Sequence, residues 1–173
     1  MRHEEVAEQI EYLFWMRDGI LAASAELTDD QFTAAESVTV RDLRATLAHQ
    51  LENEWAWRIR LDDGSFPDGD IVPADYPTLG ALVARWRQEE AALRAWFDGL
   101  SDADLELRPP GADNPLARWR YLLAVVNHGT QQFSEAAVLL TCLRHSPGEI
   151  SYLAFCSTAD ADSRRSAPPE APP

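Results

Sequence analysis

A long and almost continuous apolar stretch near the C-terminal end, residues 121–143, constrains this chain more than any other feature. Its leucine, valine, alanine and aromatic residues recur with the spacing of a helix that is buried on most sides. Three polar residues, His128, Gln132 and Glu135, fall within roughly 60° of one another at about 100° per residue. An unpaired buried polar group costs about 1–3 kcal/mol. The stripe is therefore predicted to meet a metal ion, a ligand or polar partners in the core.

Three further segments have helical apolar spacing, and none shows the alternation of a strand. The sequence predicts an all-α fold, an antiparallel four-helix bundle with a short C-terminal helical segment. The predicted helices span residues 3–26, 40–62, 78–100 and 115–144, with the short segment at 150–155. Thr39 and Thr78 are the predicted N-cap residues of the second and third helices. Residues 1–157 are predicted to form one domain, and residues 158–173, rich in Ser, Ala, Asp and Pro, a disordered tail.

Composition excludes several classes of function. The net charge is −14, and no basic patch is present that could bind nucleic acid or an anionic membrane. All 15 basic residues are arginine, so Schiff-base chemistry on lysine is excluded. Two cysteines without CxxC spacing indicate a reduced chain. With no signal peptide and no stretch of about 20 apolar residues, the predicted location is the cytoplasm.

Two charged residues lie within apolar stripes. Arg17 lies among the apolar residues of the first helix, where either its stem packs while its head reaches water, or the cation points into the bundle. Glu90 lies in the middle of the third helix's stripe. It either pairs with Arg17 across the bundle or binds a metal ion, because a buried charge needs a partner. Bundles build cofactor sites from inward side chains, so we expect Glu90, His49 and His128 to meet.

Several segments carry a resemblance to a known family. The stretch NHGTQQFSEAA at 127–137, followed by HSPGE at 145–149, resembles the C-terminal signature of the DinB family of DinB/YfiT-like metalloenzymes. Residues 40–57, with His49 and then Glu-Trp-Ala-Trp, resemble the family's second helix, and LTDDQF at 27–32 resembles its first turn. The resemblance extends over nearly the whole chain to about Phe155.

The resemblance implies a four-helix bundle, often a homodimer, with a divalent metal bound by three histidines. One histidine comes from the second helix and two, four residues apart, from the fourth. On this sequence the first two are His49 and His128. The third position holds Gln132, and the next residue, commonly arginine in the family, is Phe133. Trp15, opposite the apolar stripe of the first helix, is a predicted dimer contact.

The Gln132 replacement weakens the expected site. A neutral carboxamide oxygen binds Zn or Ni much less tightly than imidazole. Zn, Ni and Mn are the expected metals, and a further donor would have to compensate. The candidates for that donor are Glu90, Glu135, Asn53 and Glu52.

Two functional hypotheses follow, and the sequence leaves open whether the protein is an enzyme. In the first, a degenerate metal site of His49, His128 and Gln132 supports thiol-dependent transferase or isomerase chemistry, in which the metal lowers the pKa of a small thiol. Arg17 would then receive a substrate carboxylate. In the second, the same pocket is free of metal and binds a small organic ligand, or the protein is a purely structural dimeric module.

Overall fold

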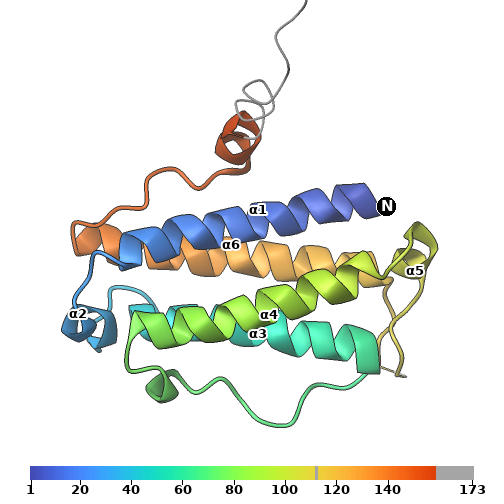
Figure 1. The fold of residues 1–173 in the computed structure, drawn as a ribbon, viewed down its shortest axis with the longest axis horizontal. Helices are drawn as coiled ribbons and strands as arrows, with labels where there is room; N and C mark the ends of the chain where they lie inside the picture. The colour runs from blue at the N-terminus through green and yellow to red at the C-terminus, as the bar shows by residue number, and fades with distance from the viewer. Residues whose placement is uncertain (112, 159–173) are drawn as a thin grey trace, which may run out of the picture.

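The computed structural model describes residues 1–111 and 113–158, and within these ranges the chain is all α-helical (Figure 1). Four long helices form a bundle, as predicted. They are α1 (His3–Ser24), α3 (Leu43–Asp63), α4 (Leu79–Asp98) and α6 (Arg118–Cys142). Short helices connect them: α2 (Asp29–Thr33), the 3-10 helix η1 (Pro73–Asp75) and α5 (Asp102–Glu106). Residues 152–158 form one more helical segment. No helix in the described part of the chain is long and apolar enough to cross a membrane.

Side-chain caps fix where two of the long helices begin. Thr78 caps α4 as predicted, with its Oγ1 accepting a hydrogen bond of 3.2 Å from the Ala81 amide. The predicted cap of α3 was wrong. Asp42, not Thr39, accepts the bond from the Ala45 amide, at 2.8 Å. The Thr39 hydroxyl instead donates to the Arg41 carbonyl at 2.8 Å, which closes a turn before the helix and delays its start.

The long helices do not simply alternate in direction. Residues 64–78 run back along the bundle, so α3 and α4 point the same way (Figure 1). Side-chain contacts agree, since Glu54 bonds Trp86 and Arg58 bonds Glu89. Helix α6 is antiparallel to α3 and returns beneath α1 (Figure 1). The closely packed pairs are α3–α6, α1–α6 and α3–α4.

Two groups of apolar side chains form the core. The larger includes Met16, Leu47, Leu51, Trp86, Phe133 and Leu140, and the smaller, toward the other end, includes Val6, Ile10, Leu93, Phe97 and Leu122. Gly129 allows the helices to approach closely, because a Cβ there would lie 2.2 Å from Leu13 Cδ1 and 3.1 Å from Gln50 Nε2. Thus α1, α3 and α6 meet at one residue, and that residue is next to His128.

The chain's own C-terminal segment packs on α1. The Phe155 ring lies 5.7 Å from Tyr12 and 5.9 Å from Trp15, between centroids. The Tyr12 hydroxyl donates to the Ile150 carbonyl at 3.0 Å. Trp15, predicted to contact a second copy, is therefore partly covered from within the chain. The predicted disordered tail, residues 158–173, lies outside the described residues apart from residue 158.

Candidate functional site

The two histidines singled out by the sequence lie edge to face between α3 and α6. Their ring centroids are 5.1 Å apart, and the ring planes make an angle of 77°. His49 comes from α3, where its side chain is 32% exposed, and His128 comes from α6, where it is half-buried. Because α3 and α6 are antiparallel, the residues that precede His49 lie beside those that follow His128. The pair therefore lies along the contact between the two helices.

Unpaired polar atoms occur on the same two helices as this pair. Seven buried side-chain atoms have no hydrogen-bond partner within the described ranges, and four of them are His128 Nε2, Gln132 Oε1, Glu135 Oε2 and Asn53 Oδ1. The first three follow one face of α6, and Asn53 lies one turn beyond His49 on α3. Buried polar groups normally have partners, and each orphan costs about 1–3 kcal/mol. Several unpaired buried atoms on these two helices indicate that a group from outside the chain completes their hydrogen bonds.

Electrostatics favour the neutral form of His128. Burial lowers the pKa of His128 first, the neighbouring His49 and Arg41 lower it further, and Glu135 opposes them. Neutral imidazole is the form that binds metal ions. The role of Arg41 was missed from sequence. Arg41 precedes the Asp42 cap of α3, and it is close enough for its charge to act on His128.

The donor set fits a divalent metal in part. Two imidazoles that share one tetrahedral ion, at nitrogen–metal distances of about 2.0–2.1 Å, hold their ring centres roughly 5 Å apart. The observed 5.1 Å is compatible with this arrangement. His49 Nδ1 lies 3.6 Å from Glu52 Oε2, which is within ion-pair range but beyond hydrogen-bond distance. Within residues 1–111 and 113–158, no three His, Cys, Asp or Glu side chains come together as ligands. A third protein donor would thus be the Gln132 amide.

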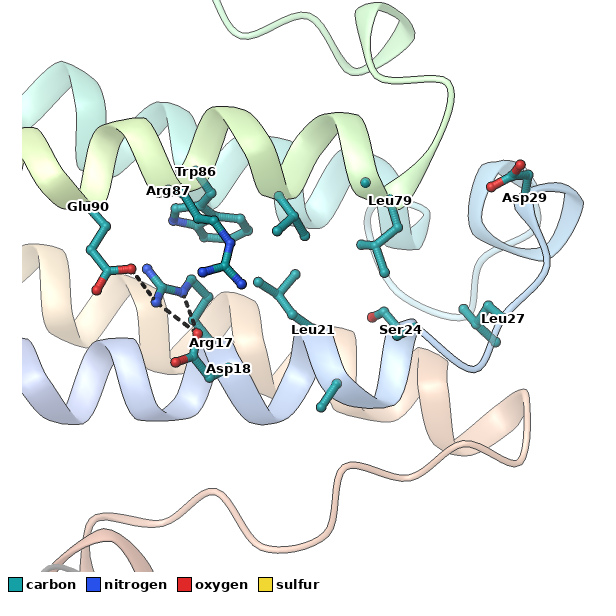
Figure 2. A pocket seen from close by; sticks show the side chains of 14 residues that line it. Arg17, Asp18, Leu21, Ser24, Leu27, Asp29, Leu79, Trp86, Arg87 and Glu90 are labelled. Atoms are coloured by element: carbon teal, nitrogen blue, oxygen red, sulfur yellow. Dashed lines mark hydrogen bonds and ion pairs between the residues drawn. The ribbon is translucent and has the colours of Figure 1, made fainter.

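Arg17 and Glu90 lie elsewhere. Arg17 Nη2 donates to Glu90 Oε2 at 2.7 Å, so the predicted pairing across the bundle is observed. Burial opposes ionisation of Glu90, but hydrogen bonds from Arg94 and Arg17 outweigh it and lower its pKa. Both residues line a groove between α1 and α4 that includes neither histidine (Figure 2). The expected meeting of Glu90 with His49 and His128 is not seen.

A second polar cluster, inside the core, was missed from sequence. Glu54 is 1% exposed, and its two oxygens accept hydrogen bonds from Gln50 Nε2 at 2.9 Å and Trp86 Nε1 at 2.8 Å. Burial raises the pKa of Glu54 to about 7. Close by, Glu89 is 2% exposed and bonded by Arg58. The signal available was the spacing of Gln50 and Glu54, four residues apart among the buried leucines of α3.

Comparison with known proteins identifies a family. The family model described as the DinB superfamily matches residues 12–133, which is more than half of the chain. The matched region contains His49, His128 and Gln132. A search of curated proteins gives no match to the chain.

Proposed function

The chain belongs to the DinB superfamily, and from this premise we propose that the pocket between α3 and α6 binds a divalent metal ion, Zn, Ni or Mn. His49 and His128 would be the principal ligands, and the Gln132 amide oxygen a weak third. The observation that supports this best is the buried, unpaired His128 Nε2 beside the unpaired Gln132 Oε1, at a histidine pair 5.1 Å apart.

The chemistry proposed for the site is transfer or isomerisation that depends on a small thiol. A bound divalent ion would lower the pKa of a thiol or water and so raise the fraction of the nucleophilic anion. The protein's residues would position the reactants. Glu52 lies within ion-pair range of the His49 ring, and Arg41 offers a cation to an anionic group of the substrate. Arg41 takes the place of Arg17, whose guanidinium is bonded to Glu90 in the other groove.

A second candidate is a pocket of the same shape without metal, binding a small organic ligand or serving in a homodimer. The amide at position 132 favours it, because carboxamide oxygen is a poor ligand for Zn or Ni. In this case the orphaned atoms of His128, Gln132 and Glu135 would bond the ligand directly.

Metal content separates the two candidates. Untagged protein is stripped with EDTA, incubated with Zn, Ni or Mn, desalted and measured by inductively coupled plasma mass spectrometry. We expect close to one ion per chain in the wild type and none in a His49→Ala/His128→Ala variant. His145→Ala, in the turn after α6, is the matched control for nonspecific binding by histidine and should keep the ion.

No retained metal in the wild type, with all three ions, would reject the metal proposal and leave the second candidate. Metal that survives in the double variant would place the ion elsewhere. If the ion is retained only by the wild type and His145→Ala, thiol-dependent transfer is the activity to assay first.

A further inference from the structure

A large groove lies between α1 and α4, away from the histidine pair. It encloses about 690 Å³, within the roughly 300–1,000 Å³ typical of small-molecule sites. It exists because α1 and α4 are not a closely packed pair and because small residues, among them Ala22, Ala25 and Gly80, line its walls. Figure 2 shows the side chains that face it.

One end of the groove holds a buried cation that is only partly satisfied. The Arg17 side chain is 5% exposed. Its Nε and Nη2 donate to Asp18 at 3.0 and 2.8 Å, and Nη2 also donates to Glu90. Nη1 is buried and has no partner in the part of the chain described. A buried guanidinium nitrogen without an acceptor is rare in folded proteins, and it indicates that an acceptor from outside the chain completes the site.

A second guanidinium lies at the same end. Arg87 is exposed, lines the groove and forms no ion pair or hydrogen bond within the described ranges. Figure 2 shows the guanidinium groups of Arg17 and Arg87 between the two helices, beside Trp86. Glu90, which offsets part of the charge of Arg17, is itself shared with Arg94. Planar guanidinium donors in this arrangement suit a carboxylate, which can accept from both.

The rest of the groove is mainly apolar. Leu21 and Leu79 follow the arginines along it, and Leu27 and Asp29 lie at the far end (Figure 2). Val83 also lines the groove. The only polar side-chain atom of Trp86 is bonded to Glu54, so its ring offers apolar surface. Carboxylates lie at both ends of the groove, with Asp18 and Glu90 beside the arginines and Asp29 at the other end. A ligand carboxylate is directed to the arginine end because the donors left unpaired in the described chain, Arg17 Nη1 and Arg87, lie there.

We propose that this groove binds an amphipathic monocarboxylate, with its carboxylate on Arg17 Nη1 and Arg87 and its hydrocarbon body along Leu21 and Val83. The site is independent of the metal site proposed between α3 and α6, because the two share no residue. It gives the protein a second ligand class, small organic acids with an apolar chain.

The test is isothermal titration calorimetry with octanoate as the probe, on protein stripped with EDTA so that no metal can bind the carboxylate. Matched probes are 1-octanol, which has the same chain without the charge, and octylamine, which has the opposite charge. Octanoate should bind one per chain, and octanol about tenfold or more weakly, because charge-assisted hydrogen bonds are the stronger kind. Octylamine should not bind.

Three variants locate the site. Arg87→Gln should weaken octanoate about tenfold by removing one charged donor, and Val83→Trp should abolish binding by filling the groove. Arg120→Gln, an exposed arginine on α6, is the matched control and should bind as the wild type does. Arg17 is left intact because it joins α1 to α4, and circular dichroism melts verify that each variant folds.

Equal affinity for octanoate and octanol, or an Arg87→Gln variant that binds as tightly as the wild type, would overturn the proposal. Loss of octanoate binding in folded His49→Ala/His128→Ala protein would also overturn it, since the ligand would then lie in the histidine pocket.

Discussion

Helix α3 has two polar faces, one toward α4 and one toward α6. They differ in whether their buried polar atoms have hydrogen-bond partners. Toward α4, Glu54 and Arg58 each have a complete set of partners from Gln50, Trp86 and Glu89. Toward α6, His49 and Asn53 face side chains whose buried atoms have none. On the first face, among the described residues, only Gln50 Oε1 is left without a partner. On the second face several buried polar atoms have no partner in the described chain.

This contrast predicts opposite responses to mutation. Substitution of polar residues in the α4-facing cluster should lower the free energy of unfolding, because each substitution leaves a buried group without its hydrogen-bond partner. Those of the α6-facing pocket should matter little for the stability of the metal-free protein, and they should matter for binding. Functional sites commonly carry such a local cost in stability.

The largest expected effect is on the paired face. Glu89→Ala should lower the free energy of unfolding by about 3–5 kcal/mol, because it leaves the Arg58 guanidinium without its buried partner. Urea denaturation followed by circular dichroism measures this. The matched control is Glu135→Ala. This glutamate is half-buried, and its Oε2 has no hydrogen-bond partner in the described chain. Its effect in metal-free protein should stay within about 0.5 kcal/mol. Comparable losses in both variants would end the distinction between the two faces.

The second effect is a pH dependence at Glu54. Its pKa is about 7 in the folded protein against an ordinary 4.5. The folded state therefore holds the proton more tightly, and stability falls as pH rises from about 4.5 through 7. At 1.36 kcal/mol per pKa unit, the loss reaches about 3 kcal/mol above pH 7. Arg17 and Glu89, the charged groups that act on Glu54, pull its pKa in opposite directions.

Glu54→Gln should remove this component. Its amide oxygen can still accept from the Trp86 indole, and its amide nitrogen can donate to the unpaired Gln50 Oε1 once that amide turns over. Relative to the wild type, the free energy of unfolding of the variant should be about 3 kcal/mol higher at pH 8 than at pH 5. A constant difference across this range would mean that Glu54 is ionised in the core at both pH values.

Much of the fold could be predicted from the sequence, since four apolar stripes of helical period give four long helices. The predicted start of α3 was wrong because two nearby residues can each act as its N-cap. Thr39 and Asp42 are both good N-cap residues, and only the turn closed by the Thr39 hydroxyl decides for Asp42. Periodicity also does not give helix direction. The parallel course of α3 and α4 depends on residues 64–78 running back along the bundle, which no local pattern encodes.

The candidate site was predictable only where spacing and family resemblance agree. His49 and His128 come together, with ring centroids 5.1 Å apart, and the role of Gln132 as a ligand stays a prediction. The predicted pairing of Glu90 with Arg17 is confirmed, and the more deeply buried acid of α4, Glu89, was missed from sequence. The roles of Arg41 and Glu54 could not be predicted from the sequence. Arg41 lies before its helix, and Glu54 is buried because α4 packs against it, so only the tertiary structure shows what each contacts.

A third effect concerns the unpaired face. Gln132→His should tighten metal binding at least about tenfold if the metal proposal holds, because imidazole replaces a weak amide ligand. Competition with a chelating fluorophore measures the affinity. The matched control is Gln131→His, an exposed position one residue away, which should leave it unchanged. An unaltered affinity in Gln132→His would show that residue 132 is not a ligand.

The smallest effect tests the contrast at neighbouring residues of one helix. Asn53→Ala should raise the free energy of unfolding of metal-free protein by about 1 kcal/mol, because it removes a buried unpaired oxygen and alanine has the higher helix propensity. Gln50→Ala, three residues earlier on α3, should instead lower it by about 1–2 kcal/mol, because the bond to Glu54 is lost. Both are measured in the same urea titrations. A loss at Asn53 as large as that at Gln50 would mean that the pocket is already satisfied in the free protein, and the unpaired face would then need no ligand to complete it.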